Sequence, residues 1–450
     1  MQSSSVSSTI VAISKGVSPK NCVINGIDHL GGISNFIKNE EKVFIKINLP
    51  FPGGFPTTIN IDTLESIIEL CHTAGAKKIY VGSFPMTNIP MNTISNILGL
   101  KQYLLKREAE LVLLDNSDYL ESKNLKSKHL EIIKVHALNK VNINNKEFEV
   151  PKIILDSDKF ISINQVNVDP ILKIQSSIFN SFSIIQPSYQ EEILEKCNNS
   201  PRNDFDEYLN HIIDVFSIKV PNLAINDMYY VLEGAGPYVY KDSNLKMTQM
   251  MVMGNDAIAV DTITLKLLGL DIKDNELLIK AKKRNIGISN ISNMKILGED
   301  VDKTEIAVKF CESNLSNIKI PNFSIRSGIT KIGDLKSGYH FLNFIKTYLI
   351  KDIKYLSKVS FLIGDKPPET ELLGNIILFG DNAIESTKNY DFRKMKKSGG
   401  VKNILEIPGN PPNINVSLKL LIEYFGKGKL PMLHFYQNLN KFYFSQGVKN

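Results

Sequence analysis

Short apolar runs alternate with longer stretches of helical period along the first 300 residues. Residues 42–48 and 77–82 are short runs rich in β-branched side chains, which predicts buried strands. Between them, Asn60 or Asp62 begins a segment of helical period that continues to about His72. Because parallel strands need crossover connections, this alternation predicts an α/β fold with a mainly parallel sheet and helices on both faces.

The same patterns predict the other elements of the chain. Strands are predicted at residues 9–14, 110–114, 159–164, 222–227, 249–253, 359–363, 376–379 and 402–407. Helices are predicted at residues 27–38, 91–107, 204–216, 257–268, 276–283 and 416–425. Residues 131–136 and 141–150 break the rhythm, and they predict a hairpin insertion at the sheet edge that turns at Asn144 and Asn145.

The chain length predicts two or three domains. We expect a large α/β domain at residues 1–302, with the hairpin insertion at about 130–150. Residues 303–345 are mixed and basic, which suits a connecting segment, and residues 346–450 predict a smaller α/β unit. No internal repeat and no low-complexity tract interrupts this order.

The composition is that of a globular protein, with 43% hydrophobic and 22% charged residues. The formal net charge of +6 is modest and predicts no nucleic-acid binding. Residues 301–450 hold 22 basic against 13 acidic side chains, so the positive charge collects in the last third. The start of the chain lacks a signal-peptide pattern and no apolar run is long enough for a membrane span, so we expect a soluble, cytoplasmic protein.

The cysteines and histidines give no metal-binding pattern. Cys22, Cys71, Cys197 and Cys311 are far apart in the sequence, without any Cys-x-x-Cys pair. The seven histidines show no spacing typical of zinc ligands. Neither a serine-hydrolase elbow nor a P-loop motif is present. We therefore expect no cofactor and no iron–sulfur cluster, although carboxylates could still hold a divalent cation.

Polar side chains follow several predicted strands, where ligands collect in open parallel sheets. Among them, Asp227, Glu233 and Asp256 could hold a hard cation, and with Asp261 they could perform acid–base chemistry. Each also has a structural explanation: Asp256, for example, is placed to cap the helix that follows it. The full set of candidate ligand-binding residues is Lys46, Asn48, Thr57, Thr58, Ser83, Asn180, Asp227, Glu233, Gly234, Gly236, Asp256 and Asp261.

These residues lie in a series of motifs that resembles domain-of-unknown-function family 362. The series comprises Leu-Gly-Gly-Ile at 30–33, Val-Phe-Ile-Lys-Ile-Asn at 43–48, Thr-Thr at 57–58, Ala-Gly-Ala-Lys-Lys-Ile-Tyr-Val-Gly at 74–82, Asn-Asp at 226–227, Glu-Gly-Ala-Gly-Pro at 233–237, Asp-Ala-Ile-Ala-Val-Asp at 256–261 and Leu-Leu-Gly-Leu at 267–270. The resemblance covers roughly residues 8–300. It implies an association with iron–sulfur proteins, for a family whose reaction is generally undefined.

The chain departs from the family pattern at one presumed pocket. Family members usually carry Pro-Lys-x-Lys-Thr-His after the central strand, whereas residues 164–169 here read Asn-Gln-Val-Asn-Val-Asp. A later family motif, Leu-Lys-Asn-x-Phe-Gly, corresponds to residues 178–183, which keep Asn180 but lose the lysine and the glycine. The usual acid after Gly82 is Ser83. These losses change the expected pocket from basic to neutral.

Two loops of the C-terminal unit resemble cysteine loops of cluster- or metal-binding proteins. Asn382 in Gly-Asp-Asn-Ala and Asn410 in Pro-Gly-Asn-Pro-Pro stand where such loops have cysteine. Asparagine cannot replace a thiolate ligand, so the resemblance implies a lost cluster site. The alternative is a pair of ordinary turn loops rich in Gly, Asn and Pro.

Three functions remain open from the sequence. The first is a divergent family member that serves as an accessory or scaffold subunit without a cluster, beside a cluster-bearing relative or a second copy of itself. The second is a metal- or small-ligand-dependent enzyme that uses carboxylates at the strand ends. The third is a binding protein that docks an acidic partner through its basic C-terminal third, although a solvated lysine-rich surface also explains that charge.

Overall fold

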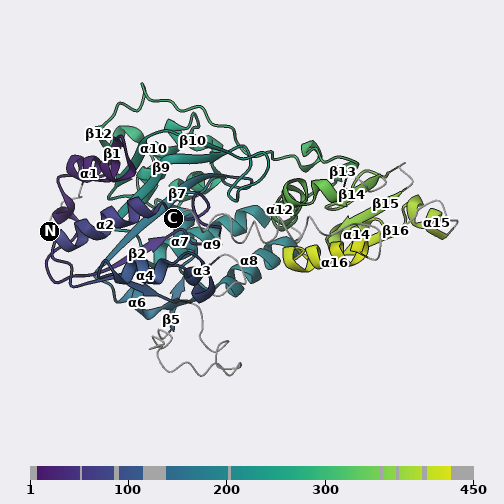
Figure 1. Cartoon of the computed structure of the whole chain (residues 1–450), viewed down its shortest axis with the longest axis horizontal. Helices are drawn as coiled ribbons and strands as arrows, with labels where there is room; N and C mark the ends of the chain where they lie inside the picture. Colours follow the sequence, from purple (N-terminus) through teal and green to yellow (C-terminus); the bar gives the residue numbers. More distant parts are fainter. Residues whose placement is uncertain are drawn as a thin grey trace.

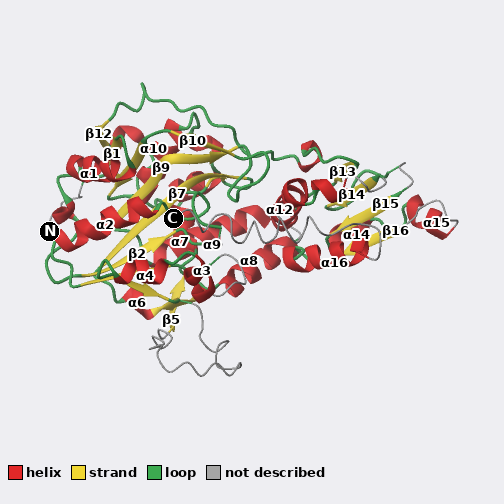
Figure 2. Cartoon of the chain, in the orientation of Figure 1, coloured by secondary structure: helices red, strands yellow, loops and turns green. Residues whose placement is uncertain are grey.

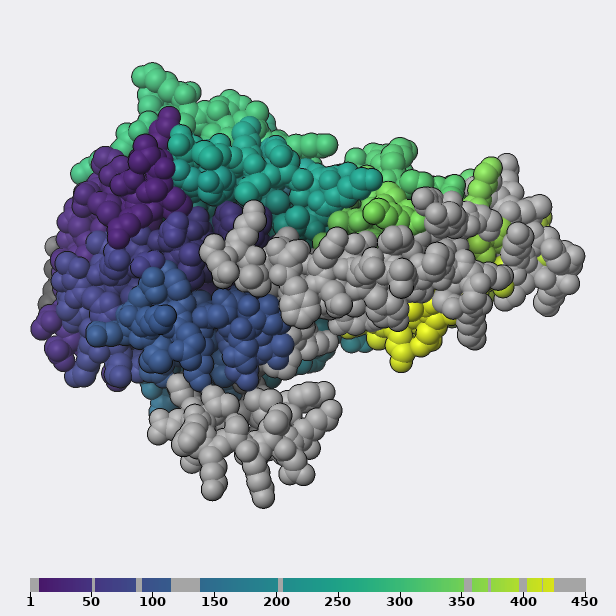
Figure 3. All heavy atoms as spheres, viewed as in Figure 1, coloured from purple at the N-terminus to yellow at the C-terminus, as the bar shows by residue number. Residues whose placement is uncertain are grey.

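The computed structural model describes residues 8–50, 53–85, 91–114, 138–200, 204–353, 358–370, 374–397 and 403–426. Within them the chain forms a broad unit built on a large sheet and a narrower unit built on a second sheet (Figure 1). Figure 2 shows helices around both sheets. The space-filling view in Figure 3 shows the same two parts, and residues from the first two thirds of the sequence form the broad part. None of the described helices combines the length and apolar character needed to cross a bilayer.

The large sheet is mixed but mostly parallel, which confirms the predicted fold class. Its strands, in spatial order, are β12 (Lys295–Gly298), β1 (Ile10–Lys15), β11 (Met250–Gly254), β9 (Leu223–Glu233), β7 (Lys159–Asp169), β2 (Lys42–Ile47), β3 (Lys78–Gly82) and β4 (Glu110–Val112). Only β11 runs antiparallel to its neighbours along this path. Two short strands extend it, β8 (Lys173–Ile174) beside β7 and β10 (Asn244–Met247) beside β9.

Helices cover both faces of the large sheet, because the crossovers between its parallel strands must pass over one face or the other. One face packs on α1 (Pro19–His29), α2 (Ile61–Thr73), α3 (Met91–Ile97) and α4 (Leu100–Leu105). We call this the α2 face. The opposite face, the α7 face, packs on α7 (Ser177–Phe182), α9 (Asp204–Ile218), α10 (Ala257–Leu267) and α11 (Glu276–Lys283).

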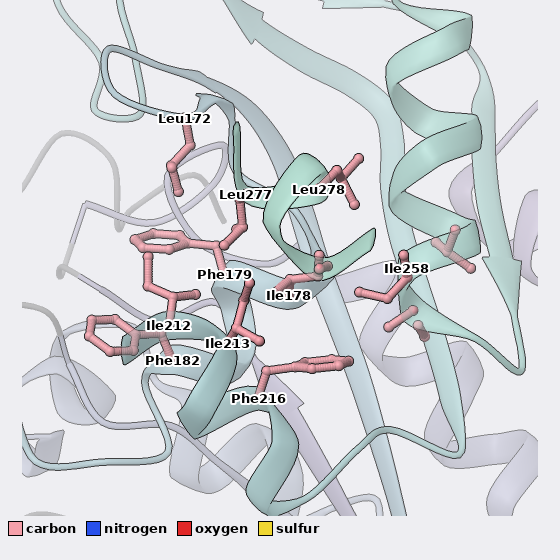
Figure 4. Close-up of a cluster of buried hydrophobic side chains, with 14 of the residues drawn as sticks. Leu172, Ile178, Phe179, Phe182, Ile212, Ile213, Phe216, Ile258, Leu277 and Leu278 are labelled. Atoms are coloured by element: carbon pink, nitrogen blue, oxygen red, sulfur yellow. The ribbon is translucent and has the colours of Figure 1, made fainter. Parts of the chain in front are cut away.

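The α7 face has a dense apolar core. Figure 4 shows Phe179, Ile212 and Phe216 among the side chains that converge there from α7 and α9. All three are buried. Burying side chains of this size contributes about 2 kcal/mol each. The core therefore fixes the helices that bring polar side chains to the sheet.

Several elements differ from the sequence-based expectation. The helix predicted at 27–38 is instead α1, which begins at Pro19 because Ser18 caps it and proline is favourable at the first helical position. The helix predicted at 91–107 is divided into α3 and α4. The predicted hairpin does turn at Asn144 and Asn145, between β5 (Leu138–Ile143) and β6 (Lys146–Pro151). It forms its own two-stranded sheet, and residues 131–136 lie outside the described residues.

The narrower unit is a parallel sheet in the order β13 (Phe323–Ser327), β14 (Val359–Ile363), β15 (Asn375–Phe379) and β16 (Asn403–Ile407). Its helices are α12 (Ile332–Tyr348), α13 (Ile350–Ile353), α14 (Asp381–Ser386), α15 (Asp391–Lys397) and α16 (Ile414–Gly426). Because β13 and α12 belong to this unit, much of the segment predicted as a connection is folded structure. We propose that the C-terminal unit begins before Phe323.

Two helices meet at the junction of the two units, α8 (Pro187–Asn199), which packs on α9, and α12, which packs on α8. A further short helix, α6 (Lys152–Leu155), follows the hairpin and lies away from this junction. Figure 1 shows α8 and α12 side by side between the two sheets. The sequence patterns did not predict α8.

Candidate functional site

The carboxyl ends of β2, β3, β7 and β9 lie at one edge of the large sheet, since these four strands are parallel. The end of β11 does not join them. β11 runs antiparallel to β9 and pairs its Gly254 with Ala224 near the start of β9. Asp256 therefore lies at the opposite edge. Its carboxylate accepts backbone hydrogen bonds from Ile258, Ala259 and Ile288, so it caps α10.

Lys46 and Asp227 lie near the same edge but on opposite faces of the sheet. Lys46 pairs with Ser162 of β7, whereas Asp227 pairs with Gln165 of β7. Side chains alternate along a strand, so positions three residues apart point to opposite faces. The strand register thus divides the expected single pocket into two buried polar clusters.

Lys46 lies on the α7 face with no exposed surface. Its ammonium donates to the backbone carbonyl of Ile47 and to the Oδ1 atom of Asn180, both at 2.9 Å. Asn180 in turn donates to the hydroxyl of Ser162 at 2.9 Å. Among the described residues, no carboxylate lies within ion-pair distance of this ammonium. Burial lowers the pKa of Lys46 well below its usual value, so its charge is costly to keep.

Asp261 lies in a second network on the α7 face. Its carboxylate accepts backbone hydrogen bonds from Ser177 at 2.9 Å and Ile178 at 3.0 Å, and a third from the side chain of Asn226 at 2.8 Å. Asn226 also donates to the Thr264 hydroxyl. Burial raises the pKa of Asp261 to about 6 despite these donors. The network joins β9, α7 and α10 to one another.

Asp227 lies on the α2 face, where it is fully buried. It accepts hydrogen bonds from the Thr63 hydroxyl of α2 at 2.5 Å and from the backbone N–H of Tyr229 at 3.0 Å. Burial raises the pKa of Asp227 to about 6. Nearby, Asn48 accepts from the backbone N–H of Gln165 at 3.1 Å, which ties the end of β2 to β7.

The smaller candidates are also buried at this edge. Thr57 and Thr58 lie in the loop after β2, and that loop contacts β7 through a hydrogen bond from Asn167 to the carbonyl of Pro56. Ser83 follows β3 and donates to the carbonyl of Phe84. These hydrogen bonds hold the loops against the sheet.

The loop at residues 233–237 lies farther along, where the two units meet. Glu233 accepts from the backbone N–H of Lys309 at 3.0 Å and from the Asn244 side chain at 2.9 Å. A side chain at Gly236 would place its Cβ 2.2 Å from the carbonyl oxygen of Val168, and one at Gly234 would lie 2.4 Å from that of Asp242. The glycines therefore allow backbone to approach backbone, rather than backbone to approach a ligand.

Ala235 and Tyr240 continue this loop into the core of the C-terminal unit. The hydroxyl of Tyr240 and the Nδ1 atom of His340 on α12 lie 2.9 Å apart. Burial lowers the pKa of His340 to about 3, so the imidazole is neutral at physiological pH. This part of the family-like motif therefore joins the two units.

Asn382 and Asn410, the two positions that resemble cysteine positions, lie together. The amide of Asn382 donates to Asp334 at 2.8 Å and is 3.4 Å from the Oδ1 atom of Asn410. Asn198, at the end of α8, donates to Asn410 and lies 3.4 Å from Asp334. We call Asn198, Asp334, Asn382 and Asn410 the junction cluster, because Asn198 comes from the large unit and the other three from the small one.

The chemistry open to these groups is limited by their partners. The carboxylates of Asp227, Glu233, Asp256 and Asp261 all accept hydrogen bonds from protein donors. In the described part of the chain, no group of three or more His, Cys, Asp or Glu side chains is arranged to hold a metal ion. Three buried amide oxygens, on Asn164, Gln165 and Gln175, have no hydrogen-bond partner among the described atoms. These oxygens could accept hydrogen bonds from water or from a ligand.

Sequence reasoning did not select several partners in these clusters, chiefly Thr63, Ser162 and Ser177. The signal for one of them was present. Ser162 and Asn164 alternate with Ile161 and Ile163, which places a polar row on one face of a buried strand. Thr63 and Ser177 carry no such signal, because their role depends on which helix lies over which strand.

The comparisons with known proteins find a family model that matches part of the chain. Residues 43–266, just under half of the chain, match the model of a family described as "Domain of unknown function (DUF362)". The matched segment contains nearly all of β2, the strands β7 and β9, and both buried clusters. No curated protein matches the chain.

Two solved structures are distantly similar. One is the lactate racemase apoprotein from Thermoanaerobacterium thermosaccharolyticum, with 10% identity, a TM-score of 0.32, and coverage of 50% of this chain and 51% of that one. The other is a structural-genomics target from Thermotoga maritima, with 10% identity, a TM-score of 0.30, and coverage of 52% and 56%. The alignments thus span about half the length of each solved chain.

Proposed function

We propose that this chain, with its DUF362-like segment, is an accessory or scaffold subunit that holds no iron–sulfur cluster and assembles with a cluster-bearing relative or a second copy of itself. One observation supports this most strongly. The buried carboxylates of Asp227 and Asp261 lie on opposite faces of the sheet, and each accepts hydrogen bonds from protein groups. Such groups hold helices on a sheet, which is a structural role.

The junction cluster supports the same proposal. Asn410 accepts a hydrogen bond from Asn198 of the large unit, and Asn382 donates to Asp334 within the small unit, so both side chains take part in the contact network at the junction. Thiolates are the usual ligands of iron–sulfur clusters, and asparagine offers none. The four cysteines do not supply a substitute, since Cys22, Cys71 and Cys197 are buried and widely separated in the sequence.

Analysis of the purified full-length chain tests both parts of the proposal. We expect no stoichiometric iron and sulfide after anaerobic purification. We also expect an oligomer by light scattering at physiological salt, alone or with candidate relatives, through contacts of over about 1,000 Å² as specific interfaces have. A strict monomer that binds none of the relatives would refute the subunit role.

One observation favours an enzyme instead, namely the buried ammonium of Lys46, which has no carboxylate partner within the described ranges of the chain. A desolvated lysine is often neutral and nucleophilic. Reductive methylation with formaldehyde at neutral pH, read by mass spectrometry, distinguishes the two functions. Under the scaffold proposal Lys46 reacts more slowly than exposed Lys196, whereas faster modification of Lys46 favours the enzyme.

A further inference from the structure

A cavity lies where α12 of the C-terminal unit packs against the large unit, away from both buried clusters. Its apolar wall is formed by Phe182 of α7 and by Pro187 and Leu194 of α8. Gln190 and Glu191 of α8, Tyr208 of α9 and Lys336 of α12 add polar groups. The cavity is small and partly open to solvent, with room for a ligand of only a few heavy atoms.

Two hydrogen-bond donors in the cavity have no acceptor among the residues that the structure describes. Lys336 is half-buried, and within the described residues its ammonium has neither a hydrogen bond nor an ion pair. Tyr208 is 4% exposed, and its ring packs edge-on against Phe182. Its hydroxyl has no hydrogen-bond partner in the described part of the chain. Tyr208 lines the cavity, so its hydroxyl is placed to donate to a ligand there.

The start of α8 lies beside the cavity. This helix has 13 residues and begins at Pro187, with Gln186 as a cap residue that makes no side-chain capping bond. Its first turn contains no acidic side chain, and Glu191 is the first acid along the helix. The N–H groups of the first turn therefore add donors and the positive end of the helix dipole at this end of the cavity.

Two carboxylates limit how much negative charge the cavity accepts. Asp169 and Glu191 lie near the ammonium of Lys336 but beyond ion-pair distance. Asp169 accepts backbone hydrogen bonds from Ile171 and Leu172, which fixes its position. Both acids repel an anion, so a ligand with one negative charge fits beside Lys336 better than a ligand with two.

We propose that this cavity binds a small monocarboxylate. The carboxylate accepts hydrogen bonds from Lys336 and Tyr208, and a short alkyl group lies against Phe182, Pro187 and Leu194. The ligand would contact α7, α8 and α9 of one unit and α12 of the other, so binding would stabilise the contact between the units. This proposal does not depend on the subunit role or on the absence of a cluster.

Calorimetric titration of the full-length chain with sodium propionate, at ionic strength held constant with sodium chloride, tests the proposal. We expect saturable binding, about fourfold tighter for propionate than for acetate because of the extra methylene. Lys336→Met should weaken binding about 10- to 100-fold, and Tyr208→Phe should weaken it about fivefold, as expected for hydrogen bonds to a charged group. Tyr208→Phe keeps the ring against Phe182, so it tests the hydroxyl in a folded protein.

Lys196→Met is the matched control. Lys196 lies on α8, is exposed, and already pairs with Glu192, so its removal should leave propionate binding unchanged. Three results would overturn the proposal. They are no saturable binding of propionate, equal binding by wild type and Lys336→Met, or tighter binding of inorganic phosphate than of propionate.

Discussion

Replacing Asp227 by asparagine should stabilise the protein at neutral pH. The carboxylate of Asp227 has no exposed surface, and no positively charged side chain is among the groups that shift its pKa. Its two hydrogen bonds survive the change, because an asparagine oxygen can accept from the Tyr229 N–H and the Thr63 hydroxyl can rotate to accept from the new amide. The substitution therefore removes an uncompensated buried charge and little else.

The size of the effect follows from the pKa of Asp227, which burial raises from 3.8 to about 6. A shift of about two units corresponds to about 3 kcal/mol. Because the folded state binds the proton more tightly than the unfolded state, this aspartate makes the protein less stable as the pH rises between about 4 and 6. Above about pH 6 the loss stays constant, so Asp227→Asn should gain about 3 kcal/mol there.

Urea unfolding at several pH values between about 4 and 7.5 measures this effect. We expect wild type and Asp227→Asn to have similar free energies of unfolding at the acid end and to diverge toward neutral pH. Asp28→Asn, which alters an exposed carboxylate, is the control and should follow wild type. If Asp227→Asn is no more stable than wild type near neutral pH, the reasoning from desolvation is refuted.

Three other outcomes are expected. Asp261→Ala should lower the free energy of unfolding by about 3 kcal/mol, because three donors lose their acceptor, and a loss below about 1 kcal/mol in thermal melts would contradict this. Burial lowers the pKa of Lys46, so the free energy of unfolding of the wild type should increase as the pH rises above neutral. Lys46→Met should lack this increase in unfolding curves, and the same pH dependence in both proteins would contradict the account. Anaerobically purified protein should hold no stoichiometric iron and sulfide, so about four of each per chain would contradict the cluster-free proposal unless a partner supplied the ligands.

The local pattern of the sequence predicts much of the large sheet. Apolar runs located β2, β3, β14 and β16 to within a residue or two, and the capping residue Asn60 located the start of α2. The pattern does not reveal the direction of a strand. β11 resembles its parallel neighbours in sequence, yet it runs antiparallel, and this moves Asp256 to the far edge of the sheet.

The sequence indicated which polar residues belong to the motifs, but it did not indicate how they are divided between the two faces of the sheet. Lys46 and Asp227 lie on strands, Asn180 on α7 and Asp261 on α10, and all four are buried. Their division between two faces depends on the register of β2, β7 and β9, which no single segment encodes. The cavity beside Lys336 was not predicted, because it is formed by helices from both units.

The junction cluster has a consequence for cutting the chain into fragments. Asn198 belongs to one unit and Asp334 to the other, and Lys331 donates from the start of α12 to the carbonyls at the end of α8. A fragment that ends before α12 would expose these carbonyls, together with Ala235 and Tyr240, which now pack in the C-terminal core. The apparent boundary between the sheets is therefore a poor place for proteolysis or gene splitting. Each half would lose part of its interior, so evolution is expected to have kept the two sheets together.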